Sequence, residues 1–209
     1  MPRTAINTWK NHAKRFHYKT VPEKSLAIKE IIPLCNSILD LGCGEGIYLP
    51  LLASKAKLAV GVDVSIERLK QVNRSESELV LADVMNLPFR SSVFDVVWSS
   101  EVLEHLPHLD VFDEIERVAT KIMLVTLPNP LGPYYWQDNT HILRYQINTL
   151  RSFLNERPSW HYSIKGLGLS TKLKIPYKLK LLIYRLTFHL PSLAFTFLIL
   201  GFKTKSVIQ

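Results

Sequence analysis

The sequence is poor in features that define several classes of protein. Only two cysteines occur among the 209 residues, Cys35 and Cys43, which are too few for a disulfide framework or a cysteine metal cluster. The first residues contain no apolar stretch typical of a secretory signal, so we expect none. Internal repeats and low-complexity segments are also missing. These absences favour one globular domain in the reducing cytoplasm, and we expect no bound metal.

Long hydrophobic runs are missing too. The most apolar part, residues 175–202, is interrupted by Arg185 and broken by Pro191, whereas a membrane-spanning helix needs about 20 consecutive apolar residues. We therefore predict a helix over residues 176–189 and a strand over about 195–203.

Acidic residues are nearly absent from the C-terminal third. The net charge is +8, yet from His141 onward there are eleven Lys or Arg residues and one acid, Glu156. This asymmetry suggests an anionic partner, such as a phospholipid surface, a phosphorylated or acidic acceptor, or nucleic acid, although a solvated basic face explains it equally well.

Three alternate glycines lie in the stretch that organises the chain. Residues 38–49 read Ile-Leu-Asp-Leu-Gly-Cys-Gly-Glu-Gly-Ile-Tyr-Leu, which predicts a buried strand, a tight turn and the start of a helix. Gly42, Gly44 and Gly46 allow the backbone to approach a ligand closely and leave amide hydrogens at a helix N-terminus. The stretch therefore indicates a nucleotide-like ligand.

A carboxylate beside this loop indicates which nucleotide. Asp40 would repel a pyrophosphate, but it suits the ammonium and sulfonium groups of S-adenosylmethionine (SAM). Ile47 stands where a dinucleotide-binding fingerprint has glycine or alanine, which argues against a nicotinamide dehydrogenase.

The motif Asp40-Leu-Gly-Cys-Gly-Glu-Gly46 resembles the first motif of class I SAM-dependent methyltransferases. Over roughly residues 30–155 the pattern resembles the small-molecule group called methyltransferase type 11. The resemblance implies an α/β, Rossmann-like, doubly wound sheet of seven strands, mostly parallel with the seventh antiparallel, and with helices on both faces.

Acidic residues also follow the second and third predicted strands. Asp63 ends a strand over residues 58–62, where a carboxylate accepts from both ribose hydroxyls, with Val64 beside it; a helix N-cap is the alternative. The resemblance implies that Asp83 accepts from the adenine amino group and that the Val84 amide reaches a ring nitrogen. A turn-capping aspartate is the alternative at Asp83.

The fourth predicted strand, residues 94–100, ends near the expected position of the cofactor's methyl group. Ser99, Ser100 and Glu101 are therefore candidate contacts to SAM, and Glu101 is also a candidate catalytic residue. Asp95 opens the strand at the far end, so we interpret it as structural.

Two further positions carry candidate chemistry. Glu104 and His105 match a Leu-Glu-His pattern common in the resembling group, and they either start a helix or contact the acceptor. His141 is predicted near the start of a helix that runs through Leu154. It is the best candidate for a general base, although a histidine at a helix start is more often a cap or hydrogen-bond anchor.

The loop over residues 128–141 is long and rich in proline and aromatic residues, as functional loops often are. Tyr134, Tyr135 and Trp136 are expected to line an acceptor pocket or to shield the site from water.

We divide the single domain into three parts. Residues 1–37 are a helical cap, with one helix from about Glu23 to Ile32, which either covers the site as a lid or packs on the sheet edge. Residues 38–155 are the cofactor-binding core. Residues 156–209 carry the last strands with a helical insertion at about 170–192, interpreted as a basic amphipathic interface helix or as buried packing.

The predicted function is methyl transfer from SAM to a small-molecule or lipid-like acceptor by in-line displacement. Alignment is the main contribution of the protein, with a base only where the acceptor must lose a proton. Peripheral membrane contact through the basic helix is one expectation. The alternatives are a nucleic-acid (RNA) methyltransferase, disfavoured because Ser-Ser-Glu replaces the Asn-Pro-Pro-Tyr type of motif, and a SAM-binding module without catalysis.

Overall fold

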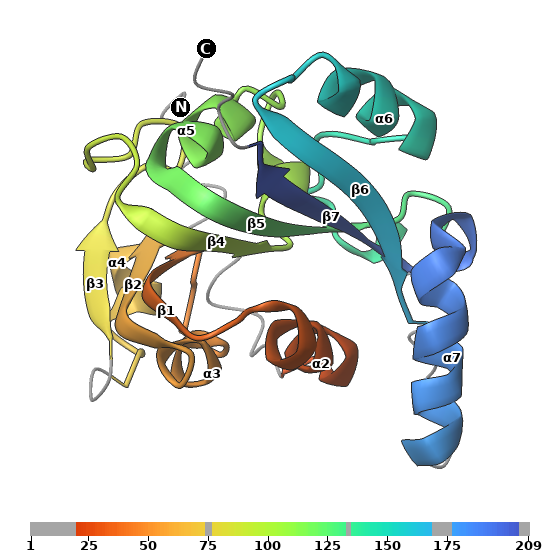
Figure 1. Cartoon of the computed structure of the whole chain (residues 1–209), viewed down its shortest axis with the longest axis horizontal. Helices are drawn as coiled ribbons and strands as arrows, with labels where there is room; N and C mark the ends of the chain where they lie inside the picture. The colour runs from red at the N-terminus through yellow and green to blue at the C-terminus, as the bar shows by residue number, and fades with distance from the viewer. Residues whose placement is uncertain (1–19, 74–76, 133–134, 169–176, 205–209) are drawn as a thin grey trace.

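The computed structural model describes residues 20–73, 77–132, 135–168 and 177–204, which form a single seven-stranded sheet with helices on both faces (Figure 1). The strand order is β3-β2-β1-β4-β5-β7-β6, and only β7 is antiparallel to its neighbours. The strands are β1 (Cys35–Leu41), β2 (Ala56–Asp63), β3 (Glu78–Leu81), β4 (Phe94–Ser100), β5 (Ala119–Pro128), β6 (Trp160–Leu167) and β7 (Thr196–Lys203). The predicted fold class is confirmed.

The helices are divided between the two faces of the sheet. They are α2 (Pro22–Ile31), α3 (Leu49–Ala53), α4 (Ile66–Leu69), α5 (Val111–Val118), α6 (Ile147–Asn155) and α7 (Tyr177–His189), with short 3-10 helices η1 (Leu103–His105), η2 (Tyr135–Gln137) and η3 (Pro191–Leu193). Helices α5 and α6 cover one face, whereas α2, α3 and α7 pack on the other (Figure 1).

The central strand β4 shows why the sheet is covered on both sides. Successive side chains of a strand point to opposite faces, and here both directions are apolar. Val97 packs in the cluster that contains Phe112 of α5, whereas Val96 and Trp98 pack in the cluster that contains Ile28 of α2. Both faces of this strand are therefore buried, as a doubly wound parallel sheet requires.

One predicted helix begins later than expected. We expected Thr140 or His141 to precede it, but α6 starts at Ile147. The backbone carbonyl of Glu104 accepts hydrogen bonds from the amides of Ile142 (2.8 Å) and Leu143 (3.1 Å). These two hydrogen bonds hold the backbone of residues 142 and 143 against η1, ahead of the helix.

The ends of the chain agree with the prediction where they are described. The helix expected over about 23–32 is α2, and the strand expected over about 195–203 is β7. The proposed interface helix is α7, while residues 1–19 and 169–176 of the predicted cap and insertion lie outside the described residues. Among the described helices, none is long and apolar enough to cross a membrane.

Candidate functional site

Two adjoining cavities lie where the carboxyl ends of β1, β2 and β4 meet. The larger has a volume of about 360 Å³ and is lined by the glycine loop, α2, η1 and the loop after β5. The smaller, of about 60 Å³, is lined by Asp63, Val64, Asp83 and Val84 among others. Gly42, Arg68 and Glu101 line both cavities, so that the two are neighbouring compartments of one site.

The glycine loop after β1 has a backbone that only glycine adopts easily. Gly42, Gly44 and Gly46 have φ angles of 73°, 56° and 73°, in the left-handed region. A Cβ on Gly44 would also lie 3.0 Å from the guanidinium of Arg68. The backbone conformation and the close neighbours therefore favour glycine at these positions, as expected for a loop that approaches a ligand with its backbone.

Asp63 is fixed at the smaller cavity by backbone amides. Its Oδ2 accepts from the amide of Gly44 and its Oδ1 from the amide of Ser65, both at 2.8 Å. Ser65, and not Asp63, caps α4, because its hydroxyl oxygen accepts from the Arg68 amide. Burial raises the pKa of Asp63, and the amides oppose that shift. Each carboxylate oxygen keeps a second lone pair for a ligand hydroxyl.

Asp83 and Val84 reach the same cavity from the segment after β3. The Oδ1 atom of Asp83 accepts from the amide of Met85 at 2.9 Å, so that the turn-capping role is present. Both residues line the smaller cavity, and Val84 is buried. A turn cap and a position at the cavity therefore coexist in Asp83.

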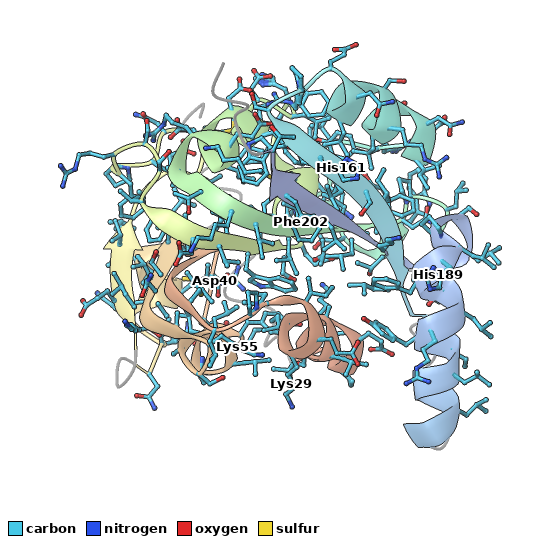
Figure 2. All side chains as sticks on the ribbon, in the orientation of Figure 1. Lys29, Asp40, Lys55, His161, His189 and Phe202 are labelled. Carbon is cyan, nitrogen blue, oxygen red and sulfur yellow. The ribbon has the colours of Figure 1, made fainter. Side chains whose placement is uncertain are left out.

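Asp40 presents a buried carboxyl to the larger cavity. Burial raises the pKa of Asp40 to about 8, and the nearby Asp63 adds to the shift. Figure 2 shows Asp40 inside the molecule, in contrast to Lys29 on the outer side of α2. A cationic ligand group would stabilise the ionised form of Asp40, so that this wall of the cavity suits an ammonium or sulfonium.

Glu101 lies at the junction of the cavities in an unusual backbone conformation. Its φ is 54°, and its side chain is held by Lys24 Nζ at 2.8 Å and by the Thr126 hydroxyl at 3.1 Å. Lys24 also donates to the Ser100 hydroxyl at 3.1 Å. Although it is a lysine, Lys24 is only 5% exposed.

Lys24 was not among the predicted site residues. The signal that points to it is its place one helical turn before Ile28, on the buried face of α2. Because Lys24 and Val21 both line the larger cavity, α2 borders the site, while Ala27 and Ile28 of the same helix pack in the core.

Ser99 lies apart from both cavities. Its side chain is fully buried, and its hydroxyl donates to the Leu41 carbonyl at 3.1 Å. Side chains alternate along a strand, so that Ser100 faces the larger cavity and Ser99 does not. Of the three predicted contacts at this strand end, the structure brings only Ser100 and Glu101 to the cavity.

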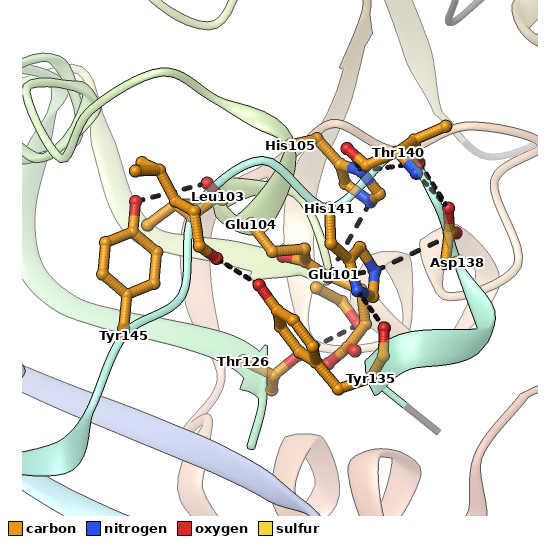
Figure 3. Close-up of polar contacts among 12 residues, drawn as sticks. Glu101, Leu103, Glu104, His105, Thr126, Tyr135, Asp138, Thr140, His141 and Tyr145 are labelled. Atoms are coloured by element: carbon orange, nitrogen blue, oxygen red, sulfur yellow. Dashed lines mark hydrogen bonds and ion pairs between the residues drawn. The ribbon is translucent and has the colours of Figure 1, made fainter. Parts of the chain in front are cut away.

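A polar cluster of Glu104, His105, Asp138 and His141 forms the far wall of the larger cavity (Figure 3). Glu104 is 1% exposed, and neither carboxylate oxygen has a hydrogen-bond partner among the described residues. Burial raises the pKa of Glu104 well above its usual range. The side chain of His141 faces Glu104, with Nε2 at 3.9 Å from Oε1. The sequence signals Glu104 and His105 only through the Leu-Glu-His pattern.

The aromatic residues of the loop after β5 have different environments. Tyr135 is buried, lines the cavity and donates its hydroxyl to the Leu143 carbonyl at 2.6 Å. Trp136 is 60% exposed and packs against the guanidinium of Arg144, whose Cζ lies 4.0 Å from the ring centre. Tyr134 lies outside the described residues.

Comparison with known proteins identifies the family of the core. Residues 39–121 match the methyltransferase domain family. Over 90 residues the chain is 39% identical to a malonyl-[acyl-carrier protein] O-methyltransferase of Legionella pneumophila, covering 39% of this chain and 31% of the relative. Over 125 residues it is 32% identical to the chloroplastic tocopherol O-methyltransferase of Arabidopsis thaliana, and this match covers 54% of this chain and 34% of the relative. The chain thus spans about a third of the length of these relatives.

Solved structures share the fold over nearly the whole chain. A chain of the complex between the Haloferax volcanii Trm112 methyltransferase activator and a methyltransferase superposes with a TM-score of 0.73 at 17% identity, with 100% of both chains covered. A SAM-dependent methyltransferase of Archaeoglobus fulgidus superposes with a TM-score of 0.61 at 19% identity, and the match covers 95% of this chain and 94% of that chain.

These similarities agree with the make-up of the cavities, which contain a glycine loop, a buried carboxyl and a carboxylate held by backbone amides. Residues 39–121 thus match a methyltransferase domain, and the chain has the fold of the class I SAM-dependent methyltransferases.

Proposed function

We propose that the protein transfers a methyl group from SAM to a small-molecule or lipid-like acceptor. The observation that carries this proposal is the larger cavity, which has the glycine loop on one side and Glu101, Tyr135 and His141 on the other. A cofactor on the loop would therefore present its methyl group toward polar and aromatic side chains. The carboxyl end of β4 lies between them, as in other doubly wound sheets that bind ligands.

Each proposed cofactor-binding residue contacts a different part of SAM. Asp40 accepts the ammonium end, Asp63 the ribose hydroxyls, and Asp83 the adenine amino group, with Val64 and the Val84 amide beside the nucleoside. SAM supplies a methyl group on a positively charged sulfur. The chain contributes alignment, which is worth roughly 7–11 kcal/mol in well-oriented reactions.

His141 is the proposed general base. Its Nδ1 faces the Tyr135 carbonyl at 2.8 Å, and a carbonyl only accepts, so Nδ1 carries the proton and Nε2 keeps a lone pair. Nε2 can then take a proton from an acceptor hydroxyl in the cavity. Glu101 is already compensated by Lys24, so its role is to position the cofactor and the acceptor more than to move a proton.

A lipid-like acceptor is favoured by the surface of α7. Tyr184 and Thr187 are buried toward the sheet, so one face of the helix serves packing. The opposite face carries exposed leucines at helical spacing, namely Leu179, Leu182, Leu186 and, beyond the helix, Leu190 and Leu193. With the basic C-terminal third, this face suits peripheral contact with an anionic lipid surface. The tocopherol methyltransferase among the relatives also has a lipid-like substrate by name.

The proposal is tested by titration calorimetry with S-adenosylhomocysteine (SAH) and, separately, NADH. We expect micromolar binding of SAH alone. Labelled SAM with lipid extracts and with small-molecule extracts should then transfer label to an extractable acceptor. No binding of SAH would refute the proposal, and SAH binding without transfer to any pool would favour the non-catalytic module.

The RNA methyltransferase alternative has its own test. Eleven basic residues in the C-terminal third would give salt-dependent binding to RNA. Absence of binding at low salt excludes this alternative, whereas transfer of label to RNA would replace the lipid-like acceptor.

A further inference from the structure

The cluster at the far wall of the larger cavity has an arrangement that the methyl-transfer reaction does not itself require. Glu104, His105 and His141 each direct one ligand-type atom to a common point, and these atoms all lie within 4.8 Å of one another. The Oε1 atom of Glu104 is 3.8 Å from His105 Nε2 and 3.9 Å from His141 Nε2. These separations are too long for hydrogen bonds, so Glu104 forms none with either ring.

The protonation of both rings follows from their outer neighbours (Figure 3). The Thr140 hydroxyl donates its only hydrogen to Asp138 Oδ1 at 2.6 Å. The Nδ1 atom of His105, at 3.0 Å from that hydroxyl oxygen and 3.2 Å from the Thr140 carbonyl, must therefore be the donor. His141 Nδ1 donates to the Tyr135 carbonyl. When such a ring carries one proton, Nδ1 holds it and Nε2 has the lone pair.

Three acceptor groups thus meet in one buried place. Glu104 is 99% enclosed, and its two oxygens have no hydrogen-bond donor among the described residues, although a buried carboxylate ordinarily has several. Lone pairs of two imidazoles and a carboxylate repel one another unless a proton or a metal cation lies between them. In a metal-bound histidine, the ring nitrogen that does not bind the metal usually donates to a carbonyl, a carboxylate or water. The Nδ1 atoms of His105 and His141 both face carbonyls in this way.

We propose that Glu104, His105 and His141 bind a divalent first-row transition metal ion, for which imidazole nitrogen and carboxylate oxygen are suitable ligands. At metal–ligand bonds of about 2.0–2.1 Å, tetrahedral ligands lie roughly 3.4 Å apart. The separations of 3.8 and 3.9 Å exceed this value by about half an ångström, which small side-chain rotations supply. Asp138, with Oδ2 at 3.9 Å from His141 Nε2, is placed to complete the ligand set or to orient that ring.

The site opens to the larger cavity, so the remaining coordination positions face the proposed acceptor. A metal there selects acceptors that carry an oxygen donor, such as a hydroxyl or carboxylate, and lowers the pKa of that oxygen. This role rests on the proposed function, whereas the metal site itself does not. With a metal bound, the lone pair of His141 is used for coordination, and the metal replaces His141 as the group that activates the acceptor.

The experiment is metal binding by the whole protein after treatment with a chelator. Zn²⁺ is titrated calorimetrically, and Co²⁺ is followed by its visible absorption. We expect one ion per chain, and a loss of affinity greater than the roughly 10- to 100-fold typical of outer-shell changes in Glu104→Gln and in His141→Gln. The matched control is His161→Gln, at an exposed histidine on β6 (Figure 2), which should leave Zn²⁺ binding unchanged.

SAH titration of the same samples separates the two proposals. If wild type binds SAH but no Zn²⁺, or if Glu104→Gln keeps wild-type Zn²⁺ affinity, the metal site is refuted and the cofactor assignment stands. If Zn²⁺ binds as expected and SAH does not, the metal site stands and the proposed function fails. An equal loss in His161→Gln would reveal adventitious binding to surface histidines and overturn the site.

Discussion

The two sides of the site are built in different ways. On the cofactor side, Asp40, the glycine loop and Asp63 come from the ends of neighbouring strands and are fixed largely by backbone amides. On the proposed acceptor side, three separate segments supply the side chains: Lys24 comes from α2, Glu101 and Glu104 from the segment after β4, and His141 from the loop after β5. The cofactor side is thus a local motif, whereas the acceptor side depends on the tertiary fold. Substitutions on the cofactor side should therefore change SAH affinity, whereas those on the acceptor side should change the stability of the fold or the use of the acceptor.

Asp63→Ala should give the largest effect. It removes the acceptor for both ribose hydroxyls and leaves the Gly44 amide without its partner, so SAH affinity should fall by at least about 100-fold, because hydrogen bonds to charged groups contribute about 1.5–3 kcal/mol each. Calorimetry measures the affinity. Asp110→Ala, at an exposed acid before α5, is the control for a general charge effect. Unchanged SAH affinity in Asp63→Ala would refute the ribose assignment.

Lys24→Met tests the acceptor side. It leaves Glu101 without its cation, and removal of one partner of a buried pair costs about 3–5 kcal/mol; because Glu101 is partly exposed, we expect about 1–3 kcal/mol in the free energy of unfolding. Urea denaturation provides the measurement, with Lys29→Met on the exposed face of α2 as control. If Glu101→Gln does not offset the cost of Lys24→Met in a double-mutant cycle, the ion pair is not what holds α2 over the site.

The pH dependence of stability sharpens the cofactor side. The pKa of Asp40 is raised to about 8 by burial, so the folded state binds more protons than the unfolded state between about pH 4 and pH 8. The free energy of unfolding of the ligand-free protein should therefore fall as the pH rises through this window, by at most about 1.4 kcal/mol per pH unit from this group. Asp40→Asn should remove that part of the slope.

SAH provides the contrasting measurement for Asp40. Its ammonium favours the ionised carboxylate, so its affinity for wild type should rise from pH 6 to pH 8 and stay flatter in Asp40→Asn. The same slope of stability in both proteins would contradict the shifted pKa.

Ser99→Ala should give the smallest effect and separates two adjacent serines. The lost hydrogen bond to the Leu41 carbonyl should reduce the free energy of unfolding by about 1 kcal/mol and leave SAH affinity unchanged. Calorimetry and thermal unfolding on Ser99→Ala and Ser100→Ala provide the comparison. Weaker SAH binding in Ser99→Ala would restore the cofactor contact that the sequence suggested.

The sequence predicts the strands and the glycine turn of the cofactor side well because their signals are local. A strand, a glycine turn and an acid at a fixed spacing leave a readable pattern, and β1, β2 and β4 end close to where that pattern puts them. The cluster of Glu104 and His141 leaves no such pattern, because these residues are distant in the chain and meet only when the Glu104 carbonyl binds the amides of residues 142 and 143.

The antiparallel direction of β7 brings a segment without cofactor motifs to the same cavity as the strand ends that carry them. Because β7 runs opposite to its neighbours, it begins, and does not end, at the cavity, where Phe195 and Thr196 form part of the lining. Asn129 binds the carbonyls of Ala194 and Phe195, both at 2.7 Å, and so joins this segment to the loop after β5. Under the proposed function, an exchange of the segment between β6 and β7 with that of a relative is expected to change the acceptor range, while the glycine loop, Asp63 and Asp83 stay unchanged.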